Sequence, residues 1–203
     1  APSYGINFPI FETIKIIDGP WSVSFDPSRG GPKEINFDTL IDWKDHPKKG
    51  VKYYSGTANY SKIFDLPDQT NLTANYMIEL GELYEMANVT LNGIDLGIAW
   101  TSPWRVSAGL ALKHKGNILT VEVANSWENR LIGDTLDQDK DIRTLKWPSG
   151  LLEGKEYKAG RYTFTTYLNE ASDFGDIKHK PYELQSSGLI GPVKILIMNY
   201  EAL

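Results

Sequence analysis

The chain has 203 residues with an ordinary globular composition, 41% hydrophobic and 23% charged, so it can bury a core and wholesale disorder is excluded. It contains no cysteine, which excludes disulfides and thiolate metal sites. The net charge is −5 and the basic residues are scattered, which disfavours nucleic acid as a partner, while no apolar run approaches the roughly 20 residues that a membrane span needs.

Alternation of apolar and polar residues predicts half-buried strands along most of the chain. In the second of them, Trp21, Val23 and Phe25 share one face, which we expect to be core. The predicted strands are 15–18, 21–25, 57–64, 73–80, 86–91, 94–99, 118–124, 161–167 and 189–198. The last strand has apolar residues on both faces, which indicates cover on both sides. No helix of ordinary length is predicted, so the fold class is all-β.

The segments between these strands are predicted to be turns and loops of one domain, 1–203. Residues 1–18 form an extended lead-in and first strand, with 3–12 packed on the surface. Asp26 opens a loop, where capping a turn is favoured over contact with a ligand. Two long polar loops are expected at 135–160 and 169–188, and loops of this length are usually functional or interfacial.

The stretch 86–134 organises the rest of the chain. Asn92-Gly93 joins two of the predicted strands and is the strongest short signal for a hairpin, because both residues tolerate positive φ. An aromatic loop, 100–105, follows the hairpin, and a polar segment, 125–134, leaves the sheet after the strand 118–124. We therefore expect an antiparallel β-sandwich that presents loops at one end.

Five motifs follow one another along the chain. They are 54–58 with 64–67, then 89–125 (with VTLNGIDLG, WRV and GNILTVEVAN), 129–134, 161–165 and 187–193. In this order they resemble the sugar-binding jelly-roll domain of family 2 glycoside hydrolases. The resemblance is closer to the C-terminal domain of bacterial α-L-rhamnosidases of glycoside hydrolase family 106, and it covers 19–197.

This resemblance implies a galactose-binding-like jelly roll and an exported bacterial protein, periplasmic or extracellular, although no signal peptide is visible. It implies as partners a glycan or plant-type polysaccharide and a glycoside hydrolase catalytic domain, with no nucleic acid and no membrane. In the resembled enzymes the catalytic carboxylates belong to a separate barrel domain. The chain is therefore expected not to be an enzyme on its own.

The carboxylates of the chain itself give little sign of catalysis. A glycosidase needs two carboxyl groups roughly 5–9.5 Å apart across the scissile bond. Glu122 is predicted to face away from the core, and Glu128 and Asp134 to lie on the exit loop, with no spacing that makes two of them converge. Catalytic residues are therefore predicted to be absent.

Metal chemistry is weighed in the same way. The residues Asp137, Asp139 and Asp141 begin like a calcium loop, but Ile142 and Pro148 stand where an EF-hand needs glycine and a carboxylate. The three histidines have no zinc spacing, and no Gly-x-Ser-x-Gly elbow is present. No cofactor is predicted, and a structural calcium elsewhere stays open.

Sugar binding needs an aromatic face for the C–H surface of a pyranose and planar hydrogen-bonding groups for its hydroxyls. The predicted ligand-binding residues offer that inventory on loops: Trp100, Trp104, Arg105, Asn129, Arg130, Asp134 and Trp147. Other roles stay open for several aromatic and charged residues. Trp104 could cap the core, Trp127 could be buried in the sandwich, and Arg130 with Asp134 could form an ion pair that locks a loop.

Three hypotheses follow. The first is a carbohydrate-binding or accessory module of a glycoside hydrolase. The second is a structural module that docks on a catalytic domain or partner without binding sugar, and the third is a small stand-alone glycosidase.

Overall fold

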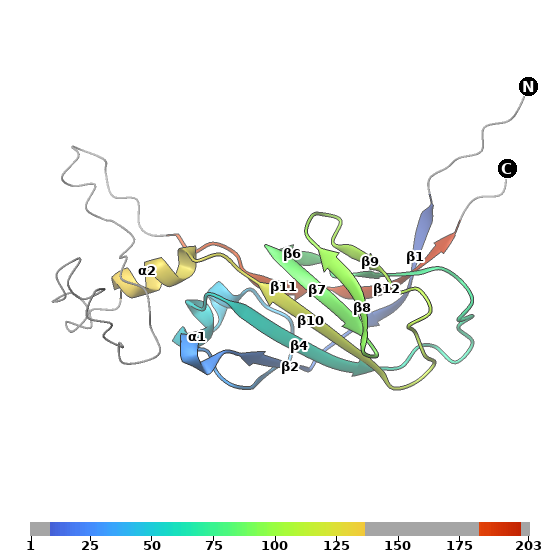
Figure 1. Cartoon of the computed structure of the whole chain (residues 1–203), viewed down its shortest axis with the longest axis horizontal. Coiled ribbons are helices and arrows are strands. Elements are labelled where there is room, and N and C mark those ends of the chain that lie inside the picture. Colours follow the sequence, from blue (N-terminus) through green and yellow to red (C-terminus); the bar gives the residue numbers. More distant parts are fainter. Residues whose placement is uncertain (1–8, 137–182, 200–203) are drawn as a thin grey trace, which may run out of the picture.

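A computed structural model describes residues 9–136 and 183–199. The described chain forms three antiparallel sheets, which confirms the all-β sandwich (Figure 1). The four-stranded sheet has the order β1 (Ile10–Ile17), β12 (Val193–Asn199), β5 (Tyr76–Glu79), β9 (Arg105–Ser107). The six-stranded sheet has the order β3 (Ile35–Phe37), β2 (Trp21–Phe25), β4 (Thr57–Phe64), β10 (Asn117–Ala124), β7 (Met86–Leu91), β8 (Ile94–Ala99). A small sheet pairs β11 (Gly188–Gly191) with β6 (Glu82–Tyr84).

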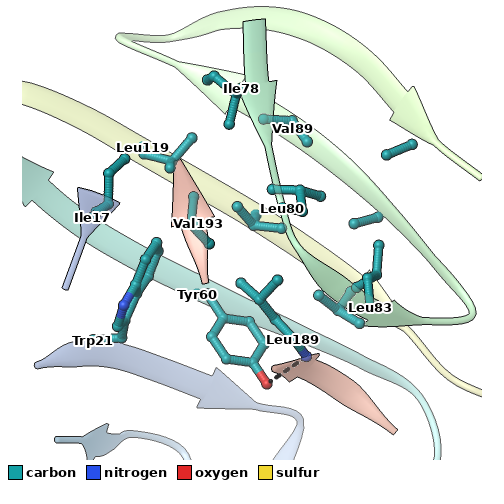
Figure 2. Packing of buried hydrophobic residues seen from close by; sticks show 14 of the residues in the cluster. Ile17, Trp21, Tyr60, Ile78, Leu80, Leu83, Val89, Leu119, Leu189 and Val193 are labelled. Carbon is teal, nitrogen blue, oxygen red and sulfur yellow. Dashed lines mark hydrogen bonds between the residues drawn. The ribbon is translucent and has the colours of Figure 1, made fainter. Parts of the chain in front are cut away.

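The core lies between the two larger sheets and uses the alternation that the sequence predicts. On β2, Trp21, Val23 and Phe25 are all buried, as are the inward residues of β7 and β10. Figure 2 shows side chains from both sheets meeting there, including Ile78 and Val193 from one and Val89 and Leu119 from the other. The side chains at alternate positions of each strand therefore pack between the two sheets and hold them together.

The hairpin at Asn92-Gly93 is confirmed. Asn92 has φ 54° and Gly93 φ 81°, and the flanking strands β7 and β8 pair from Leu91–Ile94 to Ala87–Ala99. Asn92 also donates from Nδ2 to the carbonyl of Ala111 at 2.6 Å and accepts the amide of Ile118 at 2.9 Å. This side chain thus ties the hairpin turn to the start of β10.

The last strand is two strands, so the single run predicted over 189–198 is wrong. Pro192 has no amide hydrogen to continue a ladder, and the chain changes sheets there, from β11 beside β6 to β12 between β1 and β5. The predicted cover of both faces is confirmed at Ile195 and Leu196, both buried. The surface lead-in at 3–12 is also too long, because β1 begins at Ile10.

Short helices fill the connections on one side of the sandwich. They are the 3-10 turns η1 (Pro27–Arg29) and η2 (Trp43–Asp45), and the helices α1 (Lys49–Lys52) and α2 (Glu128–Leu136). Asp26 caps η1 by accepting the amide of Ser28 at 2.9 Å, which confirms the turn-capping interpretation. No helix within the described ranges is long and apolar enough to cross a membrane.

The helix α2 corrects the prediction that 125–134 is an exit loop and that the long loop begins at 135. Its residues Asn129, Ile132 and Gly133 are buried, a spacing of three and four that puts them on one helical face. Glu128 in the first turn suits the positive end of the helix dipole. Residues 137–160 of the first predicted long loop, 169–182 of the second and the predicted strand 161–167 lie outside the described residues.

Candidate functional site

Three neighbouring strands of the six-stranded sheet bring exposed apolar side chains to the same end. Ala124 at the end of β10 pairs with Met86 at the start of β7, and Ala99 at the end of β8 pairs with Ala87. Trp100 follows Ala99 directly and Trp127 lies three residues beyond Ala124, so both residues leave the sheet at this end. Met86, Trp100 and Trp127 are 47%, 72% and 57% exposed. We call this end of the sandwich the rim, built by Asp42, Lys44, Glu82, Tyr84, Glu85, Met86, Trp100, Trp127 and Ser186.

The loop from β8 to β9 is anchored at Trp104 and exposes the side chain of Trp100. The carbonyl of Trp104 accepts the amide of Leu80 at 2.8 Å, and the Trp104 ring packs half-buried against the core. This confirms the alternative in which Trp104 caps the core. The loop stands over the start of β7 beside β6 (Figure 1). Trp100 is thus the aromatic surface that this loop offers to a ligand.

A hydrogen-bonding cluster lies at the same end of the sandwich. Tyr84 of β6 donates from its hydroxyl to Glu82 at 2.6 Å, and this hydrogen bond raises the pKa of the phenol, which stays protonated. Lys44 of η2 donates to the Ser186 hydroxyl at 2.7 Å and pairs with Asp42 at 3.3 Å. The cluster therefore offers hydroxyl and carboxylate groups from three separate segments.

Hydrogen bonds of two buried side chains hold the cluster in place. The Asp42 carboxylate, itself buried, accepts the amides of Lys44 at 3.1 Å and Ser187 at 3.0 Å. Asn129 of α2 bonds the backbone of Gln185 twice, donating to its carbonyl at 2.7 Å and accepting its amide at 2.8 Å. These bonds fix the approach to β11, and with it the position of Ser186.

The distance between the aromatic and polar parts is bounded by the chain. Ala87 and Ala99 face each other, at about 5 Å between Cα atoms for a paired antiparallel position. Tyr84 lies three residues before Ala87 and Trp100 one residue after Ala99, at about 3.8 Å per step. Their Cα atoms are therefore at most about 20 Å apart, a span that a short oligosaccharide can bridge.

Two of the predicted binding residues have structural partners instead. Arg105 forms an ion pair with Glu79, to which its Nε donates at 2.7 Å, and its guanidinium lies 4.4 Å from the ring centre of Phe11. Arg130 is buried and donates to the carbonyl of Arg29 at 2.8 Å. The prediction of both on loops is wrong, because Arg105 begins β9 and Arg130 lies in α2.

The other predicted residues are divided in the same way. Asn129 is only 2% exposed and works through Gln185, so it positions the cluster and does not face solvent. Trp127, for which burial was one alternative, is exposed. Asp134 lies in α2, but its side chain is outside the described part of the structure, and so is Trp147 altogether. Of the predicted set, Trp100 is therefore the one whose side chain the structure places on the rim.

The carboxylates considered as catalytic candidates lie on different elements of the fold. Glu122 is exposed on the outer face of β10, as predicted, whereas Glu128 opens α2 and does not lie on a loop. Within residues 9–136 and 183–199, no three His, Asp or Glu side chains gather to hold a metal ion. Asp42, Lys44, Glu82, Tyr84 and Ser186 were not predicted, because no local pattern links segments up to 144 residues apart.

Comparison with known proteins places the chain beside parts of much larger enzymes. No protein-family model matches it. The "Putative beta-glucuronidase" of Formosa agariphila is 35% identical over 190 residues, which are 90% of this chain. The structure of a rhamnosidase from Novosphingobium sp. PP1Y superposes with a TM-score of 0.73 at 29% identity and covers 96% of this chain.

In both comparisons the chain spans about 16% of the length of the relative. The chain is thus similar to one portion of glycoside hydrolases, and this portion has the same sandwich fold in the rhamnosidase.

Proposed function

We propose that the chain is a non-catalytic β-sandwich module of a glycoside hydrolase of the α-L-rhamnosidase type, exported with its enzyme, and that its rim contacts glycan. The similarity to the rhamnosidase over 96% of the chain supports the kind of module. The observation that carries the proposed contact is the 72% exposed ring of Trp100 at the same end of the sandwich as a cluster of hydroxyl and carboxylate groups. An apolar ring and convergent polar groups are what a pyranose requires.

Calorimetric titration with rhamnose- and galactose-containing oligosaccharides tests the proposal. We expect binding in the millimolar range or tighter, and Trp100→Ala to weaken it by about tenfold, because stacking on an aromatic ring contributes about 1 kcal/mol beyond area burial. Trp147→Ala tests the second predicted tryptophan in the same titration. Quenching of tryptophan fluorescence by acrylamide should fall when the sugar covers Trp100.

Leu110→Ala is the matched control. Leu110 is 90% exposed, but it follows β9 at the opposite end of the sandwich, so its loss should leave binding unchanged. Absence of binding to every glycan at millimolar concentration would remove the sugar-contact proposal. Equal losses in the two variants would remove the rim as its place.

A second candidate is a docking module that binds no sugar. It is favoured by the exposed apolar group Met86, Trp100 and Trp127 together with the chain's 16% share of its relatives, which leaves a large enzyme for such a surface to contact. Size-exclusion chromatography with the product of the neighbouring coding region distinguishes the two. Docking predicts a complex that Trp100→Ala weakens, in a chain that binds no glycan.

A non-catalytic module should hydrolyse no glycoside by itself. Assays with nitrophenyl α-L-rhamnoside and β-galactoside should show no turnover above buffer, and turnover that purifies with the chain would contradict this.

A further inference from the structure

The ionisable groups of the rim are unbalanced. Asp42, Glu82 and Glu85 carry three carboxylates, and Lys44 carries the one ammonium among the residues that build the rim. Glu82 and Glu85 are exposed, while Asp42 is buried. The lysines of α1 follow η2, which α1 contacts, and Figure 1 draws α1 apart from β6 and from the loop between β8 and β9. Among the described residues that build the rim, negative charges therefore outnumber positive ones.

The ammonium of Lys44 is already engaged. It lies 3.3 Å from the Asp42 carboxylate and donates to Ser186 at 2.7 Å. Since Asp42 is only 8% exposed, drawing Lys44 toward an anion from solvent would leave a buried carboxylate without its counter-ion, which is costly. Among the described residues that build the rim, an anionic ligand thus finds no cation that is not already paired.

The groups that face outward are those that recognise hydroxyls. The Glu82 carboxylate accepts hydrogen bonds, and its partner Tyr84 and the Ser186 hydroxyl can each accept one as well as donate. A sugar hydroxyl satisfies these groups, whereas the carboxylate of a uronate or the sulfate of a sulfated sugar would face Glu82 and Glu85 with like charge. Repulsion of the wrong ligand is a common source of specificity.

We propose that the rim selects uncharged sugars and rejects uronates and sulfated sugars, an inference that rests on the proposed function of the rim as a glycan contact. Each exposed carboxylate at about 7 Å in water lowers the affinity for a singly charged anion by about threefold. Glu82 and Glu85 together therefore give about tenfold discrimination at low salt. The discrimination should fall as salt screens the exposed charges.

The test uses one oligosaccharide in two forms, a uronate-containing chain and the same chain with its carboxyl groups reduced to hydroxymethyl groups. Both are titrated against the whole protein by calorimetry in low and high sodium chloride. We expect the reduced form to bind about tenfold more tightly at low salt. The gap should close in high salt and in the double variant Glu82→Gln, Glu85→Gln.

The control is the double variant Glu12→Gln, Asp68→Asn, which removes two exposed carboxylates away from the rim and leaves the same net charge as the test variant. It should keep the full gap. The inference would be overturned if the uronate form bound as tightly as the reduced form, or if the difference in affinity persisted in the rim variant and disappeared in the control. The proposed glycan contact would stand in either case. Failure of both forms, together with the neutral oligosaccharides above, would overturn the proposed function and the inference with it.

Discussion

The guanidinium of Arg105 lies between the carboxylate of Glu79 and the ring of Phe11, on the outer face of the four-stranded sheet. Lys194 of β12 adds a second cation at 3.4 Å from Glu79. From the sequence, an arginine after a tryptophan-rich loop is equally suited to bind a ligand and to pair with other residues of the protein. The residues of its cluster, Glu79, Phe11 and Lys194, come from three other strands and are not linked to it by any local pattern. Its role is therefore decided by cross-strand register.

Burial raises the pKa of Glu79, but the hydrogen bonds and charges of Arg105 and Lys194 outweigh burial, so the pKa in the folded protein is below its ordinary value. A lowered folded pKa gives stability above the unfolded pKa of about 4.3, and this stability is lost as pH falls through the folded value. We expect Glu79→Gln to lower the free energy of unfolding by about 1–3 kcal/mol at pH 7, since it leaves two cations unpaired. Urea denaturation should show the difference shrinking below about pH 4.

Asp68→Asn is the comparison for this effect. Asp68 and Lys115 are 3.9 Å apart with side chains 87% and 73% exposed, and such a pair contributes little. A loss as large as that of Glu79→Gln, or a Glu79→Gln effect that does not change with pH, would show that the cluster is not what stabilises the sheet.

Asn129 gives a second prediction at this scale. Its buried side chain forms two part-buried hydrogen bonds with the backbone of Gln185, and Asn129→Ala would leave that amide and carbonyl without this partner. We expect a loss of about 1–3 kcal/mol in urea denaturation. Asn59→Ala, at an exposed position of β4, should change stability by less than about 0.5 kcal/mol. An equal response of the two variants would contradict the anchoring role.

At the scale of elements, strands with one clean face were predictable and irregular connections were not. The strands over 21–25, 57–64 and 86–91 match β2, β4 and β7 because period-2 burial depends on local sequence alone. The helix α2 was missed because half of its buried residues are polar, and these two, Asn129 and Arg130, bond to backbone groups of distant segments. A hydrophobic pattern cannot show burial of that kind.

Gly188 at the start of β11 requires glycine for a reason of packing as well as of φ. Its φ is +91°, and a Cβ there would lie 2.3 Å from Nε1 of Trp43. We expect Gly188→Ala to lower stability by more than about 3 kcal/mol, because the bulky Trp43 ring is fully buried and has nowhere to move.

Gly93→Ala tests the cost of positive φ without the close contact to another side chain. Gly93 also has positive φ, +81°, but nothing lies within 4 Å of its Cβ position, so only backbone strain of about 1 kcal/mol is expected. Thermal denaturation of both variants checks the difference. If the two lose equal stability, the close approach of Trp43 to β11 is not tight.

At the scale of the molecule, the sequence predicted the sandwich and the exposed aromatic loop, but not the rim as a whole. Trp100 could be named because one local segment carries the aromatic and turn signals. Lys44, Tyr84 and Ser186 could not, because they meet only through the pairing of β6 with β11 and the contact of η2 with Ser187. A site assembled from three segments depends on tertiary register, which periodicity does not contain.

Tyr60 connects the parts that build the rim to the main sandwich. From β4 its hydroxyl accepts the indole N–H of Trp43 in η2 and the amide of Leu189 in β11, the latter at 3.3 Å (Figure 2). All three residues are fully buried. Removal of this hydroxyl leaves two buried donors unpaired in a dry core, which costs about 1–3 kcal/mol for each group.

We therefore expect Tyr60→Phe to lower the free energy of unfolding by about 2–4 kcal/mol at pH 7, measured by urea denaturation. Burial raises the pKa of Tyr60, so the wild type has this stability below the unfolded pKa of about 10 and loses it as pH rises above that value. The difference between wild type and variant should accordingly shrink above about pH 10. Tyr84→Phe, which removes a hydroxyl on the half-exposed rim, should cost less than about 1 kcal/mol at pH 7. Equal costs would mean that η2 and β11 are held to the sandwich by packing alone, without the Tyr60 hydroxyl.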